Sequence, residues 1–434
     1  MAMTRSAFSF VFVVLAAVTP FAYGEEGHVH QAGDGSGVPV FELVLDGFFY
    51  HDNQHGGGAE LIEEAAGILH GVHGHEHEHG ASNGLNLGES EIALTADLPG
   101  QLKGRLSLAL STEAVELEEA WLQTQALPGG LALKAGRFLS DIGYLNGQHP
   151  HQQEFAGGNL VYGALLGAHG LIDAGVQLTW EAPVPFYLQL GVETLQGHEQ
   201  ERFGALIEAE DADDIVLSGA GLSLPRSGPR SGTFFLKAAP YLGERHSLQA
   251  GVSYAHARQY QQVINEDAAI VDDQFALEGR QQLSGLELVY EYDADGEQGK
   301  GDWKLAAEYL QLKKAMRVTG ADTTAPVQIG DTVNGTQDGL YVQGMYGIAP
   351  RLQLGLRYEV SGMLNELDEA GSVRTFDASV RTSVAVTFRP SPATRLRLQF
   401  SSADVSDEAG VKTQLNAFVL GYTGMFGGHE GHAH

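Results

Sequence analysis

The sequence predicts an all-β fold, a transmembrane antiparallel β-barrel of about sixteen strands with long external loops. Three observations predict it: strand segments with one apolar and one polar face, connections that alternate between short and long, and no later apolar stretch near twenty residues in length. Without such a helix, a chain that enters a membrane must close its strands into a barrel, because only closure pairs every backbone polar group.

The alternation of apolar and polar residues is clearest in the second half of the chain. Between Leu352 and Ser361, apolar residues alternate with Gln353, Arg357 and Glu359. A period of two marks a strand with two different faces. In a soluble sandwich the apolar face points inward, whereas in an outer-membrane barrel it faces lipid and the polar face lines the lumen.

The pattern recurs sixteen times, and bacterial single-chain barrels require an even number of strands. An even number also places both chain ends on the periplasmic side. The predicted strands are 38–50, 88–98, 104–112, 115–125, 131–138, 175–182, 186–194, 233–242, 247–260, 279–293, 302–316, 339–349, 352–362, 376–390, 394–404 and 412–426.

The connections separate the barrel from the soluble alternatives. Every second connection is short and carries turn residues, such as Pro99-Gly100 and Pro350-Arg351. Short periplasmic turns and longer external loops are typical of a transmembrane barrel. We predict that the barrel spans residues 38–426. The longer connections are expected at 51–87, 139–174, 195–232, 261–278, 317–338, 363–375 and 405–411.

The first 24 residues have the features of a secretory signal peptide. Arg5 is followed by the apolar run 8–18, and the small residues Ala22 and Gly24 precede an expected cleavage point. The alternative, a retained membrane anchor, would need a longer apolar run. We therefore expect export to the outer membrane of a Gram-negative cell, with a histidine-containing periplasmic segment at 25–37 and a histidine-rich tail at 427–434.

Composition excludes several classes of function. The formal net charge of −30 repels nucleic-acid phosphates, and the absence of cysteine excludes disulfides, thiolate metal sites and cysteine nucleophiles. No Ser/His/Asp constellation or carboxylate pair stands at a persuasive spacing. We expect neither enzymatic activity nor an obligatory cofactor.

Histidine is the main chemical signal. Nine of the 18 histidines fall between residues 28 and 79, interleaved in one stretch with Glu76 and Glu78. Neutral imidazole binds zinc and several other divalent metals, and glycines in the same stretch favour exchangeable capture over a closed structural site. The alternative is a solvated, glycine-rich first loop whose histidines are incidental. The candidate metal ligands are His28, His30, His51, His55, His70, His73, His75, His77, His79, His149, His151, His429, His432 and His434.

Four stretches resemble a proteobacterial family commonly labelled zinc-regulated TonB-dependent outer-membrane receptors, which is similar to phosphate-selective (O/P type) porins. They are Leu117-Glu118-Glu119-Ala120-Trp121, 126–131, 134–139 and 146–151, and the resemblance is clearest over 115–195. It implies an outer-membrane barrel connected with zinc. The family has Trp-Asp after its His-x-His, where this chain has Gln153-Glu154.

The length of the chain does not favour TonB coupling. A TonB-dependent receptor needs a barrel of about 22 strands and a plug domain ahead of it, whereas only 25–37 stand before the first predicted strand.

The connection 139–174 is the expected constriction loop, by resemblance to sixteen-stranded general porins in which the loop at this place narrows the lumen. His149, His151 and Glu154 lie in it. These side chains can form an ion-binding point in the lumen, or they can hydrogen-bond the loop to the barrel wall. Both interpretations stay open at the level of sequence.

The leading functional hypothesis is a porin-like channel, monomeric or homotrimeric in outer-membrane lipid, that assists uptake of zinc or another divalent metal. The acidic connection 261–278 would concentrate cations at the mouth. The alternatives are a metal-binding surface or receptor protein without passive conductance, and an anion-selective porin, since basic side chains in a pore favour anions. The expected pore-lining residues are Arg357, Arg381, Arg389, Arg395, Arg397 and Glu359.

Overall fold

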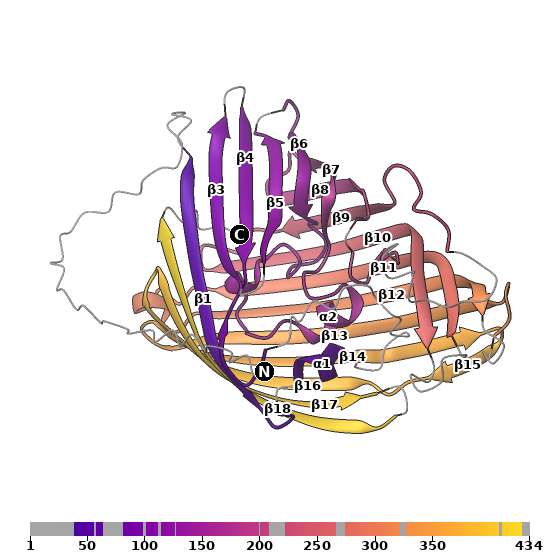
Figure 1. The fold of residues 1–434 in the computed structure, drawn as a ribbon. Coiled ribbons are helices and arrows are strands. Elements are labelled where there is room, and N and C mark those ends of the chain that lie inside the picture. The colour runs from indigo at the N-terminus through magenta and orange to yellow at the C-terminus, as the bar shows by residue number, and fades with distance from the viewer. Residues whose placement is uncertain are drawn as a thin grey trace, which may run out of the picture. The chain divides into compact units, whose positions relative to one another are not determined.

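The computed structural model of the chain contains a closed antiparallel β-barrel (Figure 1). It does not describe the predicted signal peptide (1–24), the periplasmic segment 25–37 or the tail 427–434 beyond residue 427. The histidines of 70–79 also lie outside the described residues. The described residues are 39–55, 58–63, 81–98, 101–111, 114–125, 127–198, 200–207, 222–265, 274–321, 327–407 and 410–427.

Sixteen strands form the ring, which confirms the predicted number. Each pairs antiparallel with the next ring strand along the chain, and the first closes on the last through a register from Glu42↔Gly427 to Asp52↔Ala417. The first eight are β1 (Val40–Asp52), β3 (Ser90–Leu98), β4 (Leu102–Leu110), β5 (Val115–Thr124), β6 (Leu131–Leu139), β7 (Ile172–Glu181), β8 (Tyr187–Leu195) and β9 (Ser231–Ala239).

The second half of the ring follows the predicted order as well. Its strands are β10 (His246–Asn265), β11 (Gln274–Tyr292), β12 (Trp303–Ala321), β13 (Thr332–Ala349), β14 (Leu352–Glu369), β16 (Ser379–Ser391), β17 (Thr394–Ser406) and β18 (Lys412–Gly427).

A few short elements stand outside the ring. The strands β2 (Gly84–Leu87) and β15 (Ser372–Thr375) only extend the pairing of β1 and β14, and neither was predicted. The short helices are α1 (Gly58–Glu63), α2 (Leu160–Leu165) and the 3-10 turns η1 (Pro150–Gln152) and η3 (Glu297–Gly299).

The two faces of the ring strands differ as the alternation predicts. On β14, Leu354, Leu356 and Tyr358 are exposed on the outside, whereas Arg357 and Glu359, at the alternate positions, are buried inside. This reversal of the soluble pattern is typical of a barrel that meets lipid with its apolar face. No helix within the described ranges is long and apolar enough to cross a membrane.

Aromatic side chains gather on the outside near the short turns. Trp180, Tyr187, Tyr346, Phe388 and Phe426 are all exposed there. Aromatic girdles at the membrane interfaces are typical of outer-membrane barrels. We therefore infer that these residues mark the edge of the hydrocarbon layer at the end of the barrel that carries the short turns.

The strands differ in length around the ring. The strands β10 to β14 have 18 to 20 residues, whereas β3, β4 and β6 have 9. The long strands take up much of the predicted loops 261–278, 317–338 and 363–375. Beyond the lipid a strand needs no apolar outer face, so residues such as those of 363–369 pair as strand without showing the alternation.

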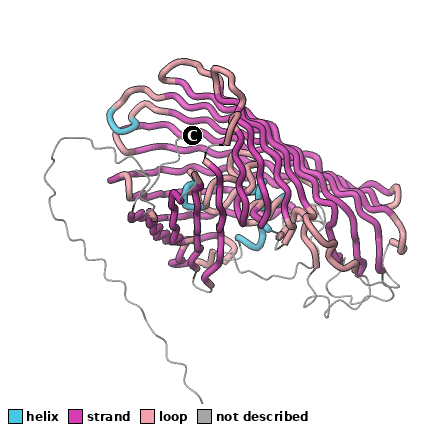
Figure 2. The backbone as a smooth tube through the Cα atoms, turned by 90° about the horizontal axis from the view of Figure 1, so that it is seen from above, coloured by secondary structure: helices cyan, strands magenta, loops and turns pink. Residues whose placement is uncertain are grey.

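The connection between β6 and β7 folds into the barrel and carries η1 and α2 (Figure 2). Tyr144, Val161 and Leu165 of this connection belong to a buried apolar cluster with wall residues that include Leu310 and Tyr341. The interior is therefore not lined by polar side chains alone, because the inserted connection has its own small hydrophobic core against the wall.

The exposed apolar wall yields a prediction about stability. Arginine in place of lipid-facing Leu356 should lower the free energy of unfolding by about 2–4 kcal/mol, because a charge near the bilayer midplane loses its hydration. The matched control Val373→Arg, on exposed β15 beyond the ring, should cost about 0–1 kcal/mol. Denaturant titration in lipid vesicles measures both, and equal costs would contradict the lipid-facing assignment.

Candidate functional site

The connection between β6 and β7, called the inserted connection below, is held to the barrel wall at β12 by the buried carboxylate of Glu308. The backbone N–H groups of Tyr144 and Leu145 donate to Glu308 at 2.6 and 3.1 Å, and the hydroxyl of Tyr162 donates at 2.9 Å. The hydroxyl of Tyr341 donates to the same carboxylate. Four donors on one buried carboxylate offset its desolvation and fix the start of the connection and α2.

A second anchor lies on β14 and β16. Arg357 and Arg381 both contact Glu359, at 3.1 and 2.6 Å, and both donate to the carbonyl of Gly158. Gly157 and Gly158 have φ of 78° and 64°, a conformation that glycine adopts without strain and that turns their carbonyls toward the guanidinium groups. The backbone N–H of Leu160 donates to Glu359 at 2.8 Å, so this group also positions the start of α2.

The arginines of β17 hold the next stretch of the connection. Arg395 donates to the carbonyls of His151 and Gln153, and Arg397 donates to that of Gln153. Glu154 pairs with Arg389 of β16 at 3.3 Å. Burial opposes the charge of Glu154, but the nearby Arg389, Lys304 and Arg395 outweigh it and lower the pKa of this carboxyl.

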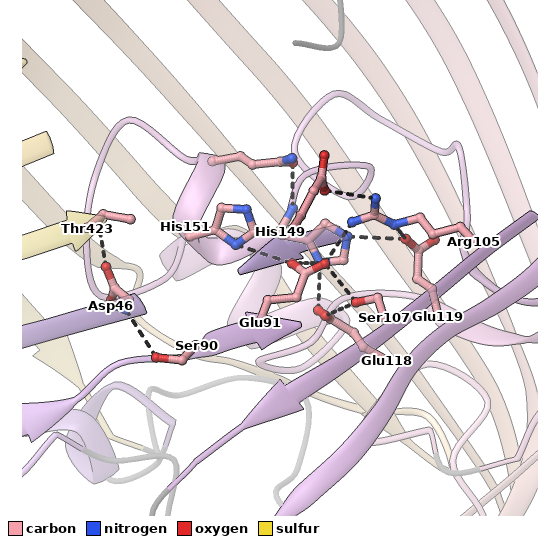
Figure 3. Close-up of polar contacts among 12 residues, drawn as sticks. Asp46, Ser90, Glu91, Arg105, Ser107, Glu118, Glu119, His149, His151 and Thr423 are labelled. Carbon is pink, nitrogen blue, oxygen red and sulfur yellow. Dashed lines mark hydrogen bonds and ion pairs between the residues drawn. The ribbon is translucent and has the colours of Figure 1, made fainter. Parts of the chain in front are cut away.

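The opposite wall, formed by β3, β4 and β5, is rich in carboxylates that gather around Arg105 (Figure 3). The guanidinium contacts Glu91 at 2.7 Å, Glu119 at 3.1 Å and Glu42 at 3.5 Å. Ser107 Oγ lies 2.9 Å from Glu91 Oε1 and 3.0 Å from Glu118 Oε2, so its single proton can be donated to either carboxylate. The carboxylates outnumber the cations on this wall, so its local potential is negative.

A β-bulge explains why two consecutive carboxylates of β5 face the interior. The register changes from Ser107↔Glu119 to Leu108↔Leu117, which leaves Glu118 as the extra residue. A bulge re-aims a side chain that strict alternation would send to the other face. Glu118 and Glu119 therefore reach the same imidazole.

That imidazole is His149, which precedes η1 and meets the acidic wall (Figure 3). Its Nδ1 lies 2.7 Å from Glu118 Oε1 and its Nε2 lies 3.2 Å from Glu119 Oε2. The ring of His151 stacks on it with 5.7 Å between centroids, and His151 Nδ1 lies 3.5 Å from Glu91 Oε2.

Two groups at this contact have displaced pKa values. Burial opposes the charged form of His149, but hydrogen bonds with Glu118 and Glu119 raise its pKa well above the usual value. Burial, together with the charge of Glu118 and a hydrogen bond to it, raises the pKa of the Glu89 carboxyl to about 8. The surroundings therefore favour the protonated forms of His149 and Glu89.

Donor atoms of Glu91, Glu118 and His149 lie within 4.8 Å of one another, which makes these three residues the candidate metal ligands among those described. The structure pairs His149 and His151 with the acidic wall, while Glu154, their neighbour in the sequence, pairs with Arg389. Both open interpretations gain support, because the contact is a wall anchor and also has the donor set of an ion site.

The other candidate residues are placed as follows. Glu359 and Arg357, Arg381, Arg395 and Arg397 lie on the inner face and are nearly fully buried under the inserted connection, whereas Arg389 keeps about a third of its side chain exposed. His51 and His55 are exposed at the end of β1 and in the turn after it. The remaining candidates lie outside the described residues: His28, His30, His70, His73, His75, His77, His79, His429, His432 and His434.

Sequence reasoning did not single out Glu91 or Arg105 and did not assign Glu118 a ligand role. Glu91 stands at an inward position of β3, in register with Ala93 and Thr95, so alternation alone could have placed it inside. The bulge at Glu118 and the approach of the distant His149 carry no comparable signal in the sequence.

Comparisons with known proteins agree with the geometry. No family model matches the chain. It is 31% identical over 400 residues to an uncharacterized protein of Aquifex aeolicus (strain VF5), an alignment that covers 91% of this chain and 80% of the relative.

Solved structures show the same fold at low sequence identity. The outer-membrane protein OmpT of Vibrio cholerae, in its trimer form, gives a TM-score of 0.51 at 12% identity, covering 90% of this chain and 99% of that one. The outer-membrane channel DcaP of Acinetobacter baumannii gives 0.52 at 12% identity, covering 89% and 97%. At this identity the likeness shows the fold, which is that of an outer-membrane porin.

The buried anchor yields a prediction about stability. Glu308→Gln should lower the free energy of unfolding by about 3 kcal/mol, because the amide cannot accept from all four buried donors. The control Glu291→Gln breaks a more exposed pair with Lys304 and should cost less than about 1 kcal/mol. Denaturant unfolding in detergent compares the two, and an equal cost would show that Glu308 does not hold the connection.

The pair His169–Glu201 yields a prediction about pH. The hydrogen bond from His169 to Glu201, at 2.7 Å, is the main cause that raises the pKa of His169 to about 9, with smaller contributions from Glu89 and Glu116. Because the folded pKa is raised, the pair stabilises the fold fully below about pH 6.5 and loses this effect as the pH rises through about 9.

Nuclear magnetic resonance of the imidazole signal, assigned by its loss in His169→Gln, measures this titration. Glu201→Gln should move the midpoint down toward the ordinary histidine value. A midpoint that stays unchanged in Glu201→Gln would show that the pair does not control it.

Proposed function

The chain belongs to the same family as the Aquifex aeolicus protein and has the outer-membrane porin fold, and from this premise we propose a channel for divalent metal ions. In this proposal the barrel assists entry of zinc or a similar ion into the periplasm. The histidine-rich segments capture ions at the two mouths of the pore, which fits the preference of imidazole for such metals.

The observation that carries the proposal is the acidic wall formed by β3, β4 and β5, which His149 of the inserted connection contacts. Glu91, Glu118 and Glu119 face the interior there, and the cations among them are Arg105 and the His149 imidazolium. Carboxylates that outnumber cations at a narrow place lower the energy of a passing cation and raise the energy of an anion.

An anion-selective porin is the second candidate, because Arg389, Arg395 and Arg397 gather on β16 and β17. Rings of basic side chains favour anions. Arg395 and Arg397, however, are nearly buried and donate to carbonyls of the inserted connection. Their charge is largely used in holding that connection, as the charge of Glu91 and Glu119 is in pairing with Arg105, so the sign of the reversal potential decides between the two candidates.

A metal-binding surface or receptor protein without passive conductance is the third candidate. The apolar cluster between the inserted connection and the wall favours it, because packed side chains fill part of the interior. None of the three candidates assigns the chain a catalytic step, an obligatory cofactor or a TonB partner. We include a homotrimer in the proposal, since the OmpT structure is described as a trimer.

Planar bilayers test the proposal directly. The purified chain should conduct, with a reversal potential in a salt gradient that indicates cation preference and a current that responds to micromolar zinc. A variant in which His70, His73, His75, His77 and His79 are replaced by Asn should lose much of that response, because the imidazoles that hold ions at the mouth are gone.

The matched control replaces the isolated His246 and His256, which lie outside the histidine-rich segments, and should keep the zinc response. A reversal potential of the opposite sign would favour the anion-selective porin. Channels indifferent to zinc would reduce the proposal to a general porin, and a chain that never conducts would favour metal capture without a pore.

A further inference from the structure

The contact between His149 and the acidic wall has the composition of a first coordination shell. We propose that Glu91, Glu118 and His149 form a binding site for a divalent transition-metal ion on the inner wall of the barrel. The inference rests on the proposed function and deepens it, since it assigns an ion-binding point inside the pore to particular side chains.

The spacing of the donor atoms fits such an ion. His149 Nδ1 lies 2.7 Å from Glu118 Oε1 and 3.7 Å from Glu91 Oε2. Bonds of about 2.0–2.2 Å from a tetrahedral zinc to nitrogen and oxygen place its ligands about 3.3 Å apart. The same geometry with the longer bonds gives about 3.6 Å, so Nδ1 and Glu118 must separate by about 0.6–0.9 Å to admit the ion, whereas Nδ1 and Glu91 already lie near the required distance.

Glu91 supplies an independent observation. The residue is 3% exposed, and its Oε2 has no hydrogen-bond partner among the described residues. A buried carboxylate oxygen without a donor carries a desolvation cost that a cation would offset. This oxygen faces the nitrogens of His149 and His151, at 3.7 and 3.5 Å.

The groups around the three ligands are arranged as supporting groups of a metal site usually are. A metal-bound imidazole commonly donates its other N–H to a carboxylate, which fixes the ring. Here His149 Nε2 lies 3.2 Å from Glu119, and Glu119 in turn accepts from Arg105 at 3.1 Å. With Nε2 committed to Glu119, the ring presents Nδ1 to the ion.

The remaining oxygens of the ligands are held from behind. Arg105 and Ser107 contact Glu91 Oε1 at 2.7 and 2.9 Å, and Ser107 Oγ lies 3.0 Å from Glu118 Oε2. This leaves Glu91 Oε2 and Glu118 Oε1 pointed at the imidazole. The ion takes the place of the proton between Nδ1 and Glu118, and that proton passes to the solvent.

The donor set indicates the class of ion. One imidazole and two carboxylates suit zinc and neighbouring first-row metals better than calcium, which prefers six to eight oxygen ligands. His151, stacked on His149, is the nearest further imidazole. The site would therefore retain a zinc ion longer than a calcium ion during passage.

Fluorescence of Trp121 gives a reading local to the site, since its indole N–H donates to Glu119 at 3.1 Å. The test uses the full chain in detergent with Trp180 and Trp303 replaced by Phe, titrated with zinc chloride and, separately, with calcium chloride. Zinc should change the Trp121 signal in a saturable manner. Glu91→Gln and His149→Gln should each weaken zinc binding at this site at least about tenfold.

The matched control is Glu181→Gln, an exposed carboxylate at the end of β7, which should bind zinc as the parent chain does. In gel electrophoresis, unheated protein that migrates to the same position as heated protein would identify a variant whose barrel has not folded, and the second variant then decides. Cobalt chloride in place of zinc should also change the Trp121 signal, and both site variants should weaken this change.

Equal zinc binding in the parent chain, Glu91→Gln and His149→Gln would overturn the site and show that His149 is a structural anchor only. Calcium binding as tight as zinc binding would overturn the assigned class of ion. The bilayer recordings test the channel and not this site. If the chain conducts and responds to zinc but does not bind zinc at Glu91, Glu118 and His149, only the site is refuted. A chain that binds zinc here but never conducts refutes the channel alone.

Discussion

The structure depends first on the absence of water in the hydrocarbon of a membrane. Every backbone N–H and C=O group of a spanning strand must then find a partner in another strand. The pairing of β1 with β18 meets this condition, because it leaves no edge strand in the ring. Closure also reverses the usual distribution of side chains, with leucine and tyrosine outside and charged groups inside.

The reversed interior creates a second problem, that of buried charge. Glu308, Arg357 and Glu359 are almost completely removed from solvent, and an isolated charge in such a place is costly. The connection between β6 and β7 solves this by presenting its own backbone: N–H groups to Glu308 and Glu359, carbonyls to Arg357 and Arg381. The wall charges therefore position the connection, and the backbone of the connection satisfies the wall charges.

Much of the fold could be predicted from the sequence, because lipid imposes a strict period on the wall. Alternation alone gave the sixteen strands in order and placed Arg357 and Glu359 on the same inner face. It fails beyond the lipid, in the outer parts of β10 to β14, where the sequence pattern predicts loops and the structure has strands.

The candidate site was harder to predict for two physical reasons. A bulge turns Glu118 inward against the period of the strand, and His149 reaches the wall from more than thirty residues away. Sequence proximity suggested Glu154 as the carboxylate beside the histidines, yet Glu154 lies against Arg389. Local patterns predict which face a residue occupies, but not which distant residue it meets.

The length of β10 to β14 has a consequence for what supports the rim of the barrel. At about 3.3 Å per residue and a tilt of about 40°, their additional residues raise one side of the rim roughly 25 Å above the other. Side chains on this raised part lie beyond the lipid and away from Glu308 and Glu359, which hold the inserted connection. The inward side chains there, including Phe275, Val333 and Leu367, pack into a buried apolar cluster, which stabilises this part of the rim without lipid around it.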